Sequence, residues 1–155
     1  MARDIPLGDL VGMGPQEIGI SDWHRITQSQ IDEFAHATGD FQWMHVDVAR
    51  ATRELGGTIA HGLLTLSLLP LLSEQIYHVS GYGGGFSYGY DKVRFTRPVR
   101  SGSRVRLHLS LTDVARKGEG IMVTVACRVE IEGDAVPALV ADWRSLYFPP
   151  AAAAS

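Results

Sequence analysis

Two polar side chains stand five positions apart in a segment too irregular for an ordinary core element. Asp40 carries a carboxylate and His45 an imidazole, both within residues 37–47. Fifteen residues after His45 a second segment begins at Ala60, in which Gly62 opens a long apolar run. A carboxylate, an imidazole and a helix N-terminus are what acid–base chemistry beside a polarised carbonyl requires. The order and spacing of all three indicate a site.

The elements around these residues can be predicted from capping residues and periodicity. Residues 18–26 are typical of a strand, and Thr27 with Gln30 three positions on forms a capping box at the start of a helix. Gly39 ends that helix, and residues 40–45 follow as an exposed turn. A second short helix is expected over 48–55, capped by Asp47.

The second half changes from helical to alternating periodicity. Residues 62–77 are apolar almost all round, which predicts a buried helix, and Pro70 should kink or divide it. After a glycine-rich loop at 81–85, strands are expected over 88–96, 103–115, 120–132 and 135–148, joined by tight turns. An antiparallel sheet wrapped around the apolar helix buries it most simply. This α+β architecture is the hot-dog fold.

Composition limits the classes of function. The 155 residues fit a single domain over 1–155, with loose ends at about 1–12 and 149–155. A net charge of −3 with scattered basic residues argues against nucleic acid or a membrane surface as partner. Cys127 is the single cysteine, so a reducing compartment is expected, and no signal pattern or membrane-spanning run is present. A cytoplasmic protein is the prediction.

The segment from Ala37 to His45, with residues 57–62 after it, resembles the MaoC-like dehydratases, which are (R)-specific enoyl-CoA hydratases on the hot-dog fold. The likeness is to a branch that includes nodulation protein N-like proteins, and it extends over most of the chain, including residues 90–95 and 98–102. The family motif is Gly-Asp, any residue, Asn-Pro, an aliphatic residue and His. Gly39, Asp40 and His45 match it, whereas Gln42 and Trp43 replace the Asn-Pro pair.

The resemblance implies a reaction and roles for three catalytic residues. Asp40 and His45 would hold one water, add its oxygen to C3 of an enoyl thioester and return a proton to C2 on the same face. The Gly62 N–H would donate to the thioester oxygen at the start of the central helix. Acyl-CoA or an acyl-carrier-protein thioester is the expected partner. No metal or other cofactor is called for.

Further residues are candidates for substrate binding, each with a plainer alternative. His61 can contact substrate or support the loop before Gly62, and Thr65, like Ser67, can line the acyl tunnel or bond back to its own helix. Arg94, with Lys92 and Arg97, can dock the CoA phosphates or form a solvated sheet face. The remaining candidates are Gln42 and Trp43 near the water, and Tyr88 and Gly89 in the pocket wall.

Two other functions remain open on the same fold. One is hydrolysis of an acyl-CoA thioester, although hot-dog thioesterases lack the Asp-then-His spacing. The other is non-catalytic acyl binding of the nodulation type, with the bulky Trp43 obstructing the water. A ketide dehydratase acting on carrier-protein thioesters is a variant of the leading hypothesis. Because a sheet of this kind leaves an edge to be covered, we also predict a homodimer.

Overall fold

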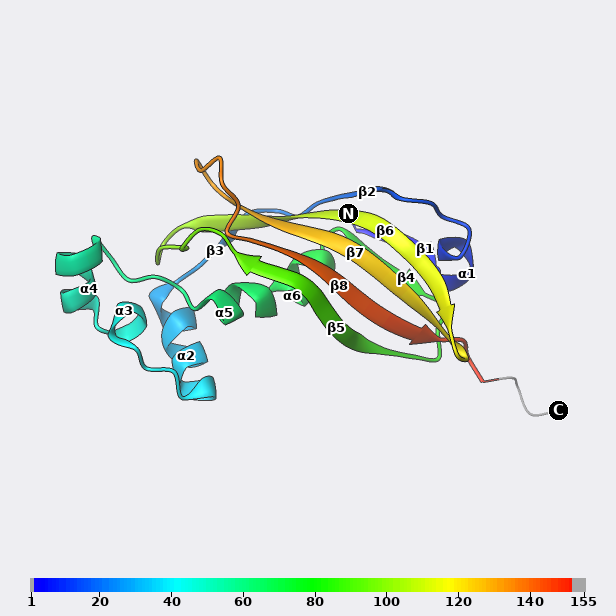
Figure 1. The fold of residues 1–155 in the computed structure, drawn as a ribbon, viewed down its shortest axis with the longest axis horizontal. Helices are drawn as coiled ribbons and strands as arrows, with labels where there is room; N and C mark the ends of the chain where they lie inside the picture. The colour runs from blue at the N-terminus through cyan, green and yellow to red at the C-terminus, as the bar shows by residue number, and fades with distance from the viewer. Residues whose placement is uncertain (1, 152–155) are drawn as a thin grey trace.

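A six-stranded antiparallel sheet is the body of the computed structural model, which describes residues 2–151 (Figure 1). Its strand order is β2-β6-β7-β8-β5, with β3 also paired to β6. A separate parallel pair joins β1 to β4. The strands are β1 (Arg3–Pro6), β2 (Gln16–Ile20), β3 (His24–Arg25), β4 (Tyr77–Ser80), β5 (Gly84–Phe95), β6 (Arg104–Lys117), β7 (Gly120–Ile131) and β8 (Leu139–Phe148).

The helices lie against one face of the sheet and beyond one of its ends. α5 contacts β8 and α6 contacts β6, while α2, α3 and α4 gather together at one end of the molecule (Figure 1). The helices are α1 (Leu7–Leu10), α2 (Gln28–Thr38), α3 (Trp43–Val46), α4 (Val48–Leu55), α5 (Gly62–Ser67) and α6 (Leu69–Ser73). Within the described residues, no helix is both long and apolar enough to cross a bilayer.

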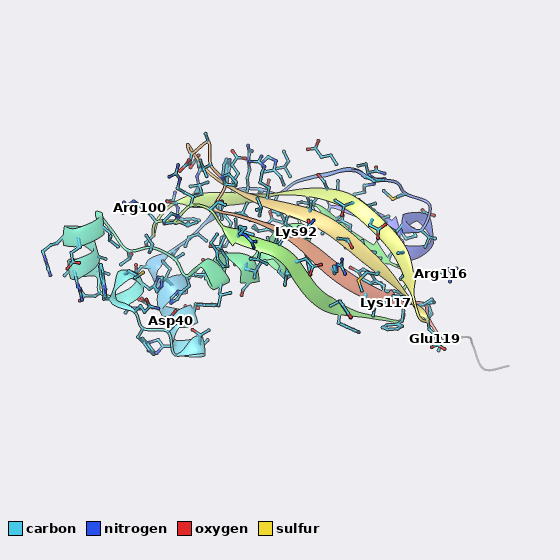
Figure 2. The ribbon with its side chains drawn as sticks, viewed as in Figure 1. Asp40, Lys92, Arg100, Arg116, Lys117 and Glu119 are labelled. Carbon is cyan, nitrogen blue, oxygen red and sulfur yellow. The ribbon has the colours of Figure 1, made fainter. Side chains whose placement is uncertain are left out.

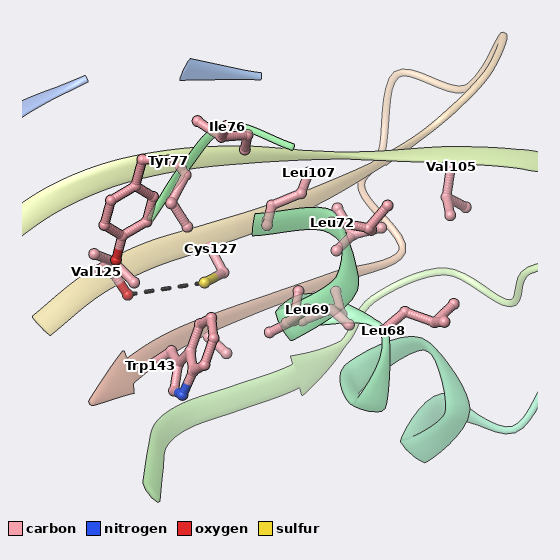
Figure 3. Close-up of a cluster of buried hydrophobic side chains, with 14 of the residues drawn as sticks. Leu68, Leu69, Leu72, Ile76, Tyr77, Val105, Leu107, Val125, Cys127 and Trp143 are labelled. Atoms are coloured by element: carbon pink, nitrogen blue, oxygen red, sulfur yellow. Dashed lines mark hydrogen bonds between the residues drawn. The ribbon is translucent and has the colours of Figure 1, made fainter. Parts of the chain in front are cut away.

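The core lies between α6 and the inner face of the sheet. Leu69 and Leu72 are fully buried and face alternate residues of the strands, among them Leu107, Val125 and Trp143 (Figure 3). Strand side chains alternate between the two faces of a sheet, so every second residue of β6 to β8 reaches this core. The predicted sheet around a central helix is therefore confirmed.

Several local predictions are also confirmed. The Thr27 hydroxyl accepts a hydrogen bond from the Gln30 N–H, and the Asp47 carboxylate accepts one from the Arg50 N–H. Gly39 ends α2 in the left-handed region at φ 78°, where a side chain would be strained. Pro70 lies in the first turn of α6, where its missing N–H costs nothing, so the apolar run divides into α5 and α6.

Other predictions need correction. The strand expected over 18–26 is interrupted after Ile20. At the break, the Leu107 N–H donates its hydrogen bond to the Ser21 hydroxyl rather than to a main-chain carbonyl of the neighbouring strand. The apolar run is not buried all round: Leu63 and Leu71 are exposed, and its end belongs to β4. The strand predicted from 88 begins at Gly84, inside the expected loop, and the one predicted from 135 begins at Leu139.

The N-terminal segment is not loose as expected. Residues 3–6 pair with β4, and Ile5, Leu7 and Leu10 are buried in the core. These contacts contribute about 2 kcal/mol for each fully buried aliphatic side chain, enough to hold a short segment in place. At the other end of the chain, residues 152–155 lie outside the described range, so the expectation of a loose C-terminus is not tested there.

Candidate active site

Asp40 lies just after α2, at the end of the molecule where the three helices meet (Figure 2). One of its carboxylate oxygens accepts a hydrogen bond from the Gln42 N–H at 3.3 Å. Carboxylates of Asp commonly hold a turn in this way, two residues ahead of themselves. The bond orients the carboxylate and leaves its second oxygen for another donor.

His45 is not in an exposed turn as predicted, but in α3, with only 7% of its surface exposed. Its Nδ1 lies 2.7 Å from the Ile59 carbonyl oxygen. Because a carbonyl can only accept, Nδ1 carries a proton, and in the neutral imidazole Nε2 then keeps a free lone pair. The Ile59 N–H in turn donates to the Met44 carbonyl at 3.0 Å, so Ile59 is held against α3 through both its N–H and its carbonyl.

His61 is the third polar residue of the site and is 4% exposed. Its Nε2–H donates to the main-chain carbonyl of Asp40 at 3.0 Å. Its ring lies face to face with that of His45, with centroids 3.8 Å apart and planes 25° apart, and Phe34 lies 5.0 Å from its centroid. Within residues 2–151, its Nδ1 is buried without a hydrogen-bond partner, at a cost of about 1–3 kcal/mol.

The three side chains form one cluster. Ligand atoms of Asp40, His45 and His61 all lie within 4.8 Å of one another. Such a set could in principle hold a metal ion. However, a metal about 2.0–2.1 Å from two imidazole nitrogens needs lone pairs that converge on it, whereas stacked rings direct theirs nearly side by side. The arrangement fits a carboxylate and an imidazole that are available for acid–base chemistry better than it fits a metal centre.

A cavity of about 230 Å³ opens beside this cluster. Of the three clustered residues, His45 lines it, together with Gly62 and Thr65, so His45 borders the same space as the start of α5. A methyl group on Gly62 would come within 2.8 Å of the Phe95 ring, which explains why the position has no side chain. Other residues of the lining are Ile59, Ala60, Phe95, Thr96, Arg97, Pro98, Val99 and Ala138.

Other predicted substrate-binding residues lie elsewhere. Gln42 is exposed beside Asp40, and Trp43 packs under the Arg50 guanidinium, 4.1 Å from its ring centroid, rather than lining the cavity. The Arg94 guanidinium donates a hydrogen bond to the neighbouring Val93 carbonyl. Tyr88 accepts a hydrogen bond from Lys117, which lies at the opposite end of the molecule from Asp40 (Figure 2). That bond lowers the pKa of the Tyr88 phenol. The structure does not bring Tyr88 or its neighbour Gly89 to the site.

Three residues of the site were not predicted. Ile59 supplies the carbonyl that fixes the tautomer of His45, and Phe95 covers Gly62. Gln28 donates to the His45 carbonyl at 2.8 Å, which ties α3 to the start of α2. A main-chain carbonyl has no signature in sequence, and neither Phe95 nor Gln28 stands out from other strand or helix residues.

Comparison with known proteins identifies the family. The family model described as a MaoC like domain matches residues 14–132. The chain belongs to the MaoC-like dehydratase family, a family of hydro-lyases. The predicted resemblance to this family is thus confirmed. The predicted branch of nodulation protein N-like proteins is confirmed by a relative described below.

Two curated relatives and one solved structure illustrate the match. The 3-hydroxyacyl-thioester dehydratase Z of Mycobacterium tuberculosis (strain ATCC 25618 / H37Rv) is 49% identical over 138 residues, covering 88% of this chain and 91% of the relative. Nodulation protein N of Rhizobium leguminosarum bv. viciae is 42% identical over 145 residues, covering 91% and 90%. The unliganded R-hydratase PhaJ1 of Pseudomonas aeruginosa is 22% identical, with a TM-score of 0.72 and coverage of 88% and 83%, which supports the hot-dog fold.

Proposed function

We propose that this MaoC-like protein is an (R)-specific enoyl-CoA hydratase that also catalyses the reverse dehydration of a 3-hydroxyacyl thioester. The observation that carries this proposal is the position of His45. Its Nε2 has no protein hydrogen-bond partner within residues 2–151, and the residue is buried beside Asp40 and lines the same cavity as Gly62. The 49% identical relative is named a 3-hydroxyacyl-thioester dehydratase, which supports the same class of substrate.

In the hydration direction, Asp40 and His45 act on one water molecule. The water donates one hydrogen bond to the Asp40 carboxylate and the other to the His45 lone pair. As its oxygen bonds to C3, one of these two groups takes its proton, and the electron pair of the C2–C3 double bond moves towards the thioester oxygen. A proton then returns to C2 from the same pair, so that addition is syn.

The negative charge that develops on the thioester oxygen needs a donor. The N–H groups of the first turn of a helix have no acceptor inside the helix, and Gly62 begins α5. Without a side chain at Gly62, the thioester can approach this N–H closely. A donor of this kind typically contributes about 3 kcal/mol to stabilisation of the transition state.

The test is loss of enoyl absorbance when the protein is mixed with crotonyl-CoA and with longer enoyl-CoAs. We expect hydration to the (R)-3-hydroxyacyl product, and a loss of at least about 100-fold in kcat for Asp40→Asn and for His45→Ala. If wild-type protein hydrates no chain length, or if both variants match it, the proposal is wrong.

The two alternative functions are tested with the same acyl-CoA substrates and different readouts. Release of free thiol, followed with a thiol reagent, would indicate a thioesterase. Tight acyl-CoA binding without product at any chain length would indicate a non-catalytic binding protein. Parallel assays with CoA and carrier-protein thioesters identify the carrier.

The proposal includes a homodimer. β5 is a long edge strand, and it exposes Phe86, Tyr88 and Phe95. An exposed edge of this length and apolar character is normally paired or covered. Edge pairing of β5 with β5 of a second copy would cover it. Light scattering that finds a stable monomer at micromolar concentration would contradict this part of the proposal.

A further inference from the structure

His61 contacts every catalytic part of the proposed site without lining the cavity itself. Its Nε2–H holds the Asp40 carbonyl, its ring stacks on His45, and it directly precedes Gly62 in the chain. Asp40, His45 and Gly62 come from three separate segments of the chain, and His61 joins them. Among the side-chain hydrogen bonds and ring contacts of residues 2–151, those of His61 reach both Asp40 and His45.

The burial of His61 argues against a purely structural role. Its Nδ1 has no partner within the described residues, so the imidazole brings an unmet hydrogen bond into the interior. An apolar ring would fill the same space between Phe34 and His45 without that penalty. The feature that an apolar ring lacks is the Nε2–H bond to Asp40.

We propose that His61 is a positioning residue that fixes Asp40 against His45 through its Nε2–H bond to the Asp40 carbonyl. This inference rests on the proposed hydratase function, because it assigns His61 a role in that reaction. Without the bond from His61, the loop after Gly39 can move, and the Asp40 carboxylate can shift away from the water that it shares with His45. Displacement of a catalytic group by about 1 Å can cost roughly 100-fold in rate.

Two variants separate this role from simple filling of space. His61→Phe keeps a flat ring against His45 but has no donor. His61→Gln loses the ring but can place an amide N–H near the position of Nε2. We expect kcat to fall by about 30- to 100-fold in His61→Phe with KM nearly unchanged, and His61→Gln to recover at least about tenfold of that loss.

A stability measurement provides the contrast. Thermal unfolding should show His61→Phe at least as stable as wild type and His61→Gln less stable, so that activity and stability move in opposite directions. A purely structural histidine predicts that the more stable variant is the more active. The inference is overturned if His61→Phe keeps wild-type kcat, or if His61→Gln is no more active than His61→Phe.

Hydrogen exchange tests the inference independently of catalysis. Exchange measured by mass spectrometry over residues 39–46 should be faster in His61→Phe than in wild type, with His61→Gln in between, and unchanged in β7. Equal exchange in wild type and His61→Phe would overturn the inference even if the protein proves not to be a hydratase. Conversely, inactive wild-type protein with the expected exchange pattern would reject the proposed reaction and keep the structural link. If His61→Phe does not fold, His61→Asn, which cannot reach the Asp40 carbonyl, replaces it in each comparison.

Discussion

At the scale of single residues, the site depends on close approach between Gly62 and Phe95. A methyl group at Gly62 would lie 2.8 Å from the ring of Phe95, closer than carbon atoms can approach without movement. Since the Gly62 N–H is the proposed donor to the thioester oxygen, any movement here misplaces it. The packing against Phe95 and the proposed donation to the thioester oxygen therefore both depend on the backbone position of Gly62.

We expect Gly62→Ala to lower kcat/KM by at least about tenfold, because either α5 or Phe95 must shift. Steady-state hydration assays measure the loss. Adding Phe95→Leu to this variant removes the clash and should restore part of the rate. Gly8→Ala is the matched control, because a methyl group there would have no neighbour within 4 Å. Full activity of Gly62→Ala would contradict the role of this contact.

The proposed acid–base pair and the glycine were selected from residue types and spacing, whereas the residues that hold them in place were not. Asp40, His45 and Gly62 were predicted together from their order and spacing and from their match to the family motif. The Ile59 carbonyl that sets the tautomer of His45 leaves no trace in the sequence. Trp43 was predicted near the water because of its position in the motif, but its contact with Arg50 depends on how α3 and α4 pack.

At the scale of elements, the junction between Gln42 and α3 explains how the unusual Gln-Trp pair is tolerated. Gln42 has φ −56° and ψ 136°, the extended conformation that a residue before proline adopts. Trp43 opens α3, where a proline is accepted because the first N–H has no acceptor within the helix. The backbone at these two positions is therefore compatible with the Asn-Pro pair of the motif.

The double variant Gln42→Asn/Trp43→Pro should therefore fold and keep hydration activity within about fivefold of wild type. It loses the contact between Trp43 and Arg50, worth about 0.5–1 kcal/mol, which corresponds to a fall in Tm of about 1–4 °C. Enzyme assays and thermal melting measure both effects. A gain of more than tenfold would show instead that Trp43 obstructs the water.

Glu130 on β7 contacts Arg106 and His108 on β6, and these contacts make the stability of the protein depend on pH. Hydrogen bonds from Arg106 and then His108 hold the pKa of Glu130 at about 2, below its usual range. A carboxyl with a lowered folded pKa stabilises the protein above its unfolded pKa of about 4.3, and this stabilisation is lost as pH falls towards 2.

Glu130→Gln should accordingly cost about 1 kcal/mol near pH 6 and almost nothing near pH 2. Thermal melting from pH 2 to 7 tests this, with Glu119→Gln as control, since Glu119 makes no ion pair within residues 2–151. A constant difference between Glu130→Gln and wild type at every pH would show that the charge of Glu130 is not involved.

Elements with local signals were predicted well, and those made by distant pairing were not. Capping residues identified α2 and α4, and alternation identified β5 to β8 apart from their ends. The parallel pair of β1 and β4 joins residues more than 70 positions apart, and neither strand has a turn signal that points to the other. The break between β2 and β3 depends on the Ser21 side chain, which a pattern of apolar residues cannot reveal.

At the scale of the whole molecule, the proposed homodimer depends on the unpaired edge of β5. Phe86 on this strand is 54% exposed, whereas the opposite edge strand, β2, is only five residues long and carries a bulge. We expect Phe86→Glu to shift the proposed dimer towards monomer by at least about tenfold in Kd, because burying an unpaired charge is costly. Light scattering over a concentration series measures the shift. Ile20→Glu on β2 is the control, and equal weakening by both variants would mean that the interface is not at β5.

In the proposed reaction, Asp40 and His45 act on the same water molecule. The most direct measurement is a double-mutant cycle of kcat for crotonyl-CoA hydration, with Asp40→Asn, His45→Ala and the combined variant. Residues that act as one unit are strongly non-additive, so we predict that the combined variant loses no more than about threefold beyond the worse single variant. Losses that multiply would show that the two side chains act independently, and would contradict a water molecule shared between Asp40 and His45.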